Sequence, residues 1–316
     1  MIRKLFRSFL LTFISGAAIL PSKAQVVNKD YASAAVQALM KGNTYVVLTT
    51  DSTFNKWLHH ALEEVWTVSK LTYITTTELD SFVKSDKNVF LFAQSRDDRG
   101  AAFHLVNGDD MSKKKEFTVI LSQGGFHQTK YLFTPATSGP KIIGYFRYAP
   151  ERAEVTAGMI EGEMLLAFMN QSLQIVIDNK VRGSVRDSIW DHIYIESPQI
   201  KDKTMIFNKA YSDGTIILDK KVLLTDKLIE DYPYTNESMS PDSVKQMLNE
   251  EPGNYCYLFL YYPSAYVKQT HSDDSGDILV YDAAQKKLLY YDDNLSGPWL
   301  EKSEFKDMLY AIKSGK

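Results

Sequence analysis

The sequence contains almost no cysteine. Cys256 is its one cysteine, so no disulfide can form within the chain. Small secreted modules held together by several disulfides are therefore excluded, and the fold must depend on its hydrophobic core. Because Cys256 lies in the apolar run YCYLFL, we interpret it as a buried small hydrophobic residue rather than a nucleophile.

An excess of positive charge is also missing. The chain has 36 lysines and arginines against 39 acidic residues, a formal charge of −3. Nucleic acids and anionic lipid surfaces require clustered basic side chains, so the composition argues against both kinds of partner. Hydrophobic residues make up 44% of the chain, which is enough to build a folded core.

The apolar run at the N-terminus is too short to span a membrane. It follows three basic residues and covers 8–20, whereas a spanning helix needs roughly 20 apolar residues. Pro21 and the small residues after it complete the arrangement that a signal peptidase requires. We predict a signal peptide over 1–24, cut between Ala24 and Gln25, and a periplasmic or secreted protein. No cysteine stands at the cut, so neither a lipid anchor nor another membrane anchor is expected.

Hydrophobic periodicity predicts alternating strands and helices in the rest of the chain. Apolar residues at helical spacing predict helices, and continuous apolar runs such as 89–93 predict strands buried on both faces. The predicted strands are 43–49, 73–74, 89–93, 101–106, 117–121, 141–148, 203–207, 231–234, 255–262, 277–282 and 287–291. The predicted helices are 31–40, 51–66, one ending at 88, 156–179, 219–228, one opening at Ser240-Pro241, and 301–312.

The second half repeats the order of the first. Residues 73–92, ending in Asn-Val-Phe-Leu-Phe, align with 234–260, ending in Asn-Tyr-Cys-Tyr-Leu-Phe-Leu. We therefore predict an α/β (α+β) protein with two similar lobes, 25–180 and 202–316, joined by a linker over 181–201. Each lobe would be a mixed sheet flanked by helices, and the two would derive from an internal duplication. A coincidence of two ordinary α/β patterns is the alternative.

Three features of the chain resemble a group of secreted proteins of Bacteroidetes. They are the strand-helix-strand pattern that begins at 43–66, the run YLFLY at 257–261, and the hairpin YDAAQKKLLYY from Tyr281. The resemblance implies an extracytoplasmic location and carries no activity.

The chain lacks the common catalytic and nucleotide-binding motifs. No HExxH, P-loop or G-x-S-x-G pattern occurs. His59 and His60 are adjacent on a predicted helix and point about 100° apart, so they cannot bind one ion as an i, i+4 pair does. The glycine-rich stretch 122–125 is interpreted as a turn. No catalytic residue, metal site or cofactor is predicted.

Acidic residues gather at both ends of the predicted hairpin over 277–291. The loop 270–277 contains three aspartates, and Asp292-Asp293-Asn294 lies where the pairing would bring the two groups together. Calcium binding is one interpretation, but the spacing is not that of an EF-hand. A solvated loop is the alternative.

Tyrosines crowd the second half of the chain. On strands, alternate side chains face opposite ways, so part of this set is expected to be exposed. An exposed tyrosine row is a good platform for contact with a protein, peptide or glycan. The residues predicted to form this surface are Tyr261, Tyr262, Tyr266, Tyr290 and Tyr291.

These observations favour a non-enzymatic binding or interaction protein of the bacterial envelope. Its expected partner is an envelope protein, a peptide or a glycan. One alternative is an envelope hydrolase acting on glycan or peptide, with carboxylates that the sequence does not single out. Another is a module that binds a small ligand in a cleft between the lobes.

Overall fold

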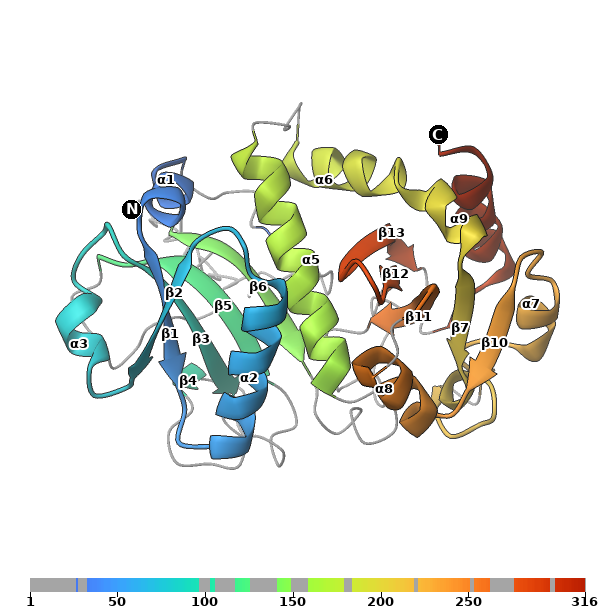
Figure 1. Cartoon of the computed structure of the whole chain (residues 1–316), viewed down its shortest axis with the longest axis horizontal. Helices are drawn as coiled ribbons and strands as arrows, with labels where there is room; N and C mark the ends of the chain where they lie inside the picture. Colours follow the sequence, from blue (N-terminus) through green and yellow to red (C-terminus); the bar gives the residue numbers. More distant parts are fainter. Residues whose placement is uncertain are drawn as a thin grey trace, which may run out of the picture.

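The computed structural model describes residues 27, 33–96, 103–105, 117–125, 141–148, 159–178, 184–218, 221–250, 253–261, 276–295 and 299–315. The expected signal peptide lies outside these residues, as do Tyr262 and Tyr266. The described part forms two lobes, each a mixed sheet flanked by helices, so the predicted fold class is confirmed (Figure 1).

The first sheet has the strand order β2-β1-β3-β5-β6, with β4 paired to β3. β1, β2 and β3 are parallel, whereas β5 and β6 join antiparallel. Three parallel strands need crossover connections, which the helices α2 and α3 provide. The elements of this lobe are α1 (Ser33–Lys41), β1 (Asn43–Leu48), α2 (Ser52–Val65), β2 (Lys70–Thr75), α3 (Leu79–Phe82), β3 (Val89–Arg96), β4 (Phe103–Leu105), β5 (Phe117–Gln123), β6 (Ile142–Tyr148) and α5 (Met159–Ile177).

The second sheet has the order β10-β7-β11-β12-β13, with the same pattern of three parallel and two antiparallel strands. β7, β10, β11, β12 and β13 therefore correspond to β1, β2, β3, β5 and β6. The elements are α6 (Val185–Tyr194), η2 (Ser197–Asp202), β7 (Thr204–Asn208), η3 (Lys209–Tyr211), β8 (Ile217–Leu218), β9 (Lys221–Val222), α7 (Asp226–Glu230), β10 (Asn236–Met239), α8 (Pro241–Glu250), β11 (Tyr255–Tyr261), β12 (Gly276–Asp282), β13 (Lys287–Leu295) and α9 (Lys302–Ser314).

Most predicted elements are found within a few residues of their expected positions. Asp51 caps α2, because its Oδ1 accepts hydrogen bonds from the backbone N–H groups of Thr53 and Phe54 at 2.9 and 3.0 Å. The helix predicted over 219–228 is wrong over 221–225 and is found only from Asp226, where the short α7 begins. β9 lies at 221–222 instead, and the chain after it is held in place because Leu223 and Leu224 are fully buried and the Leu224 N–H donates to the Tyr211 carbonyl. The strand expected at 231–234 begins later, at Asn236.

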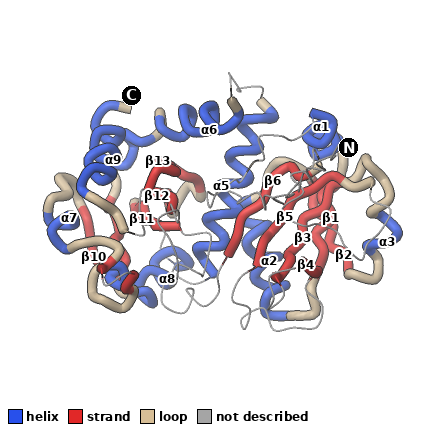
Figure 2. The backbone as a smooth tube through the Cα atoms, turned by 180° about the vertical axis from the view of Figure 1, so that it is seen from behind, coloured by secondary structure: helices blue, strands red, loops and turns tan. Residues whose placement is uncertain are grey.

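The helix α5 lies between the two sheets (Figure 1), and the view from behind shows the same arrangement (Figure 2). It packs against α2 and β6 in the first lobe and against β13 in the second. Its side chains Met164, Leu165 and Phe168 belong to a hydrophobic cluster that also contains Phe259 and Leu279 of the second sheet. One core therefore runs across both lobes.

Helix α6 and the turn after it cover the outer edge of β13. The predicted linker segment thus contains a helix that packs on the second sheet. Gln171 of α5 bonds to both the N–H and the carbonyl of Leu288, and Ser197 Oγ donates to the Leu289 carbonyl. These side chains satisfy backbone groups that an exposed edge strand would leave open.

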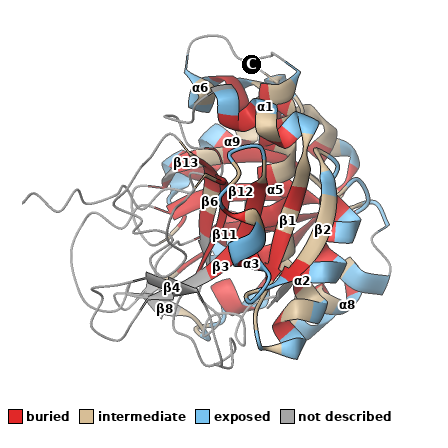
Figure 3. Cartoon of the chain, turned by 90° about the vertical axis from the view of Figure 1, so that its left-hand side faces the viewer, coloured by how far each residue is buried: buried red, intermediate tan, exposed pale blue. Residues whose placement is uncertain are grey.

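Both faces of the second sheet are covered. Along β11, Tyr257 and Phe259 point to the cluster around α5, whereas Cys256 and Leu258 point to a second cluster with α7 and α9. Figure 3 shows buried residues along the strands and exposed ones on the outer faces of helices such as α2. Among the described residues, no helix combines the length and apolar character needed to cross a membrane.

Candidate functional site

Three of the five tyrosines predicted to form a binding surface are buried. Tyr261, Tyr290 and Tyr291 are only 3%, 1% and 5% exposed, so the expectation that they present their rings to a partner is wrong. The physical reason is that helices cover both faces of the second sheet. Because side chains alternate along the strands, successive rings point into the two hydrophobic clusters on either face of the sheet. Neither face leaves its rings in solvent. Tyr262 and Tyr266 lie outside the described residues.

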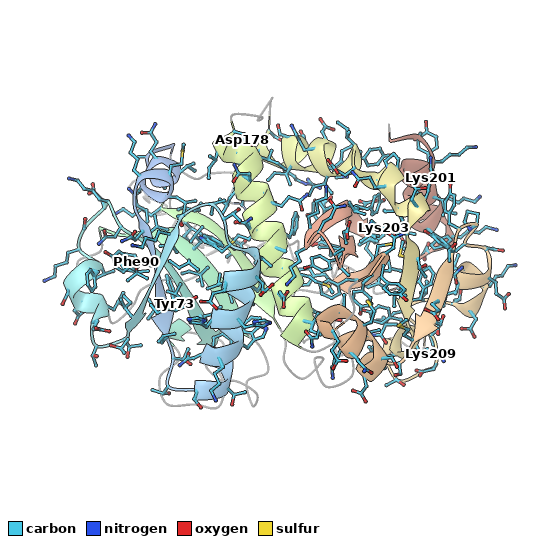
Figure 4. All side chains as sticks on the ribbon, in the orientation of Figure 1. Tyr73, Phe90, Asp178, Lys201, Lys203 and Lys209 are labelled. Carbon is cyan, nitrogen blue, oxygen red and sulfur yellow. The ribbon has the colours of Figure 1, made fainter. Side chains whose placement is uncertain are left out.

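Cys256 is completely buried, which confirms its interpretation as a small core residue. Burial raises the pKa of the thiol to about 12. A reactive cysteine needs to be a thiolate near neutral pH, whereas the raised pKa keeps this thiol protonated there. Beside it, Lys203 and Asp282 form a buried ion pair at 3.1 Å that joins the start of β7 to the turn of the β12–β13 hairpin. Figure 4 labels Lys203 at that position.

The two histidines on α2 are exposed on the surface of the first lobe. His59 stacks on Tyr73, with ring centroids 4.3 Å apart, and its Nδ1 lies 3.1 Å from Glu63 Oε2. Figure 4 labels Tyr73 next to α2. The described residues contain no group of three or more His, Cys, Asp or Glu side chains that could hold a metal ion.

Asp277, at the end of the predicted acidic loop, lies next to the acidic run that ends β13, as the strand pairing predicted. Gly276 pairs with Leu295 and Ile278 with Asp292, which places Asp277 beside Asp293. Both aspartates are buried, and Arg186 of α6 forms an ion pair with Asp293. Burial, followed by the charges of Asp277 and Asp293, raises the pKa of Tyr291. The ion pair of Arg186 with Asp293 anchors α6 to β13. The rest of the acidic loop lies outside the described residues.

A second buried polar cluster lies where α5 crosses the second sheet. Glu161 Oε1 accepts hydrogen bonds from the hydroxyls of Tyr211 and Tyr257, each at 3.4 Å. Asn208 Nδ2 donates to the Tyr257 hydroxyl at 3.2 Å, while its Oδ1 accepts the backbone N–H of Ala210. This cluster ties the N-terminal turn of α5 to β7, η3 and β11. All four side chains are buried, so the cluster is suited to positioning these elements.

An open pocket lies in the second lobe, between α7 and the start of α9. Its volume is about 700 Å³, and Figure 1 shows α7 and α9 on the side of the lobe away from α5. Pockets of 300–1,000 Å³ lined mainly by apolar groups are typical of small-ligand sites. The residues that line it are Val222, Thr225, Lys227, Leu228, Asp231, Trp299, Leu300, Glu301 and Lys302. We call it the α7–α9 pocket.

The walls of the α7–α9 pocket are fixed by local hydrogen bonds. The Leu300 N–H donates to the Leu223 carbonyl at 2.8 Å, which pins the segment before α9 to the segment before α7. Trp299 Nε1 donates to Glu301 Oε1 at 3.1 Å and so fixes the indole ring. The N–H of Glu301 donates to Glu304 Oε2 at 2.8 Å, as in a capping box, and this fixes the start of α9.

The interior of the α7–α9 pocket is apolar, and its rim is charged. Leu228 and Leu300 are only 6% and 2% exposed and belong to the core beneath α7 and α9. Lys227, Asp231, Glu301 and Lys302 are exposed around them. Sequence analysis missed this site because its two halves lie far apart in the chain, and neither half carries a motif.

Comparison with known proteins gives no functional assignment. No protein-family model matches the chain, no curated protein is detectably similar to it, and no solved structure matches its fold. The function must therefore be inferred from the geometry of the chain itself.

Proposed function

We propose that this chain is an exported, non-enzymatic binding protein that takes its ligand in the α7–α9 pocket. The observation that carries the proposal is the pocket itself: about 700 Å³, with Leu228, Leu300 and Trp299 forming an apolar lining inside a charged rim. An apolar interior supplies affinity through burial of ligand surface, and a few polar groups at the rim supply orientation.

The composition of the described polar groups supports binding rather than catalysis. Three of the buried carboxylates, those of Glu161, Asp282 and Asp293, are held by tyrosine hydroxyls, a lysine and an arginine, respectively. The pocket rim holds two lysines and two acids without a histidine, cysteine or serine among its lining residues. This set can orient a ligand by charge but offers no activated nucleophile.

The location proposed for this activity is the periplasm or the exterior of the cell. The N-terminal sequence 1–24 has the basic head, apolar stretch and small residues of a signal peptide. Mass spectrometry of the protein recovered from the producing cells tests this directly. We expect a polypeptide that begins at Gln25, whereas a chain still carrying Met1 in the cytosolic fraction would contradict export.

Thermal unfolding in the presence of defined probes tests binding. A ligand that binds only the folded chain stabilises it, by about 2.7 kcal/mol when present at 100 times its Kd. We expect a short peptide or oligosaccharide probe to raise the Tm of the wild-type protein. In Thr225→Trp, the indole would fill the pocket from its exposed rim, so the shift should be lost.

Asp226→Trp is the matched control, because Asp226 is exposed on the same helix turn but does not line the pocket. It should respond to the probe as the wild type does. Equal shifts in all three proteins would place binding elsewhere and overturn the proposal. No shift with any probe would also overturn it.

A further inference from the structure

The charged side chains on the rim of the α7–α9 pocket differ in whether they already bind another side chain. Within the described part of the chain, no ion pair or side-chain hydrogen bond involves Lys227, Asp231 or Lys302, although all three line the pocket. Glu301 differs, because its carboxylate accepts the indole N–H of Trp299. Two ammonium groups and one carboxylate are therefore available to a ligand.

These groups surround an apolar lining made by Val222, Leu228, Trp299 and Leu300. A complementary ligand carries an apolar group for the lining, an anionic group for the lysines and an N–H donor for Asp231. A charged hydrogen bond of this kind contributes more than a neutral one.

We infer that the pocket binds the C-terminal residue of a peptide. Its apolar side chain packs on Leu228, Leu300 and Trp299, its α-carboxylate pairs with Lys227 and Lys302, and a backbone N–H of the peptide donates to Asp231. A simple fatty acid has the apolar group and the carboxylate but no N–H donor. A glycan lacks both the aliphatic side chain and, when neutral, the carboxylate. The peptide C-terminus is the ligand that uses all three features.

This inference rests on the proposed function, since it names the ligand of the same pocket. It is tested by isothermal titration calorimetry of the full chain with three probes. They are N-acetyl-Ala-Ala-Leu with a free C-terminal carboxylate, the same peptide with a C-terminal amide, and octanoate. We expect the free acid to bind at least about tenfold more tightly than the amide, because a charge-assisted hydrogen bond is stronger than a neutral one. Octanoate should bind more weakly than the free acid.

Variants of the rim separate the roles of the charges. Lys227→Ala combined with Lys302→Ala should remove the preference for the free acid and leave the weaker binding of the amide. Asp231→Asn should weaken both peptides and leave octanoate unchanged. Lys306→Ala and Asp226→Asn are the matched controls, since both residues are exposed on α9 and α7 but do not line the pocket. They should bind all three probes as the wild type does.

Each of the other calorimetric outcomes would overturn a specific part of the proposal. Equal affinity for acid and amide, abolished by Thr225→Trp, would overturn the carboxylate inference while the pocket remains a binding site. Octanoate binding as tightly as the peptide acid would show that the ligand is a simple carboxylic acid and overturn the peptide assignment. Failure of all three probes would overturn the inference. The proposed function would then fail only if the wider probe panel described above also gave no shift.

Discussion

Trp57 of α2 packs against the backbone of Gly162 in α5, so closely that a Cβ atom on residue 162 would lie 2.7 Å from Cζ2 of the indole. A real Cβ does not approach another heavy atom to that distance, so an alanine here must displace the ring. The absence of a side chain at Gly162 therefore sets how closely α2 and α5 approach. Since α5 also contacts the second sheet, this contact helps to place the helix between the lobes.

We predict that Gly162→Ala lowers the free energy of unfolding by about 1–3 kcal/mol, as overpacking of a core does. The higher helix propensity of alanine, worth up to about 1 kcal/mol, would reduce this loss but not reverse it. Urea denaturation measures the change. In a Trp57→Leu background the ring is gone, so Gly162→Ala should be neutral or stabilising. An unchanged free energy of unfolding in the presence of Trp57 would contradict the account.

The buried cluster at the N-terminal turn of α5 gives a second prediction. Tyr257→Phe removes the hydroxyl that accepts from Asn208 and donates to Glu161. Each of these two buried groups then loses a partner, so the free energy of unfolding should fall by about 1–3 kcal/mol. Tyr310→Phe is the control, because Tyr310 is 60% exposed and its replacement should have little effect. Equal stability of the two variants would show that the cluster contributes nothing.

The buried tyrosines make stability depend on pH in the alkaline range. Burial is the main cause that raises the pKa of Tyr257, Tyr281, Tyr290 and Tyr291 above that of a free tyrosine, because a phenolate loses its hydration. The folded chain thus holds these protons more tightly than the unfolded chain. Their contribution to stability is complete below about pH 10, the unfolded pKa, and is lost as pH rises above it.

We therefore expect the free energy of unfolding to fall above pH 10 by about 1.4 kcal/mol per pH unit for each buried tyrosine that stays protonated. Tyrosinate absorbance and far-UV circular dichroism, followed together during alkaline titration, test this. The absorbance of the buried set should rise only as the helical signal is lost. Complete tyrosinate formation with an intact circular dichroism spectrum would contradict the burial of these rings.

The sequence was enough to predict the order of helices and strands, but not which elements cover each face of a sheet. The runs 89–93 and 255–261 are apolar throughout, and both are buried strands, because an uninterrupted apolar run requires cover on both faces. For Tyr290 and Tyr291, alternation established only that the rings point to opposite faces. Which faces are covered depends on where α5, α6 and α9 pack, and that is decided by contacts distant in sequence.

The α7–α9 pocket was beyond sequence reasoning for a related physical reason. The helical propensity of the segment around Leu223 and Leu224 does not reveal that both side chains are fully buried. The hydrogen bond from the Leu300 N–H to the Leu223 carbonyl then brings the two walls of the pocket together. A site defined by a long-range backbone contact leaves no local pattern in either segment. Periodicity predicts faces and lengths of elements, whereas this pocket depends on tertiary packing.

The most direct test of the account is the indole N–H resonance of Trp299 in a two-dimensional NMR spectrum, assigned through Trp299→Phe among the four tryptophans of the chain. Titration with N-acetyl-Ala-Ala-Leu should shift this resonance in the wild type, leave that of Trp57 in place, and shift neither in Thr225→Trp. A Trp299 resonance that stays unmoved at saturating peptide, or that shifts equally when the pocket is filled, would contradict binding in the α7–α9 pocket.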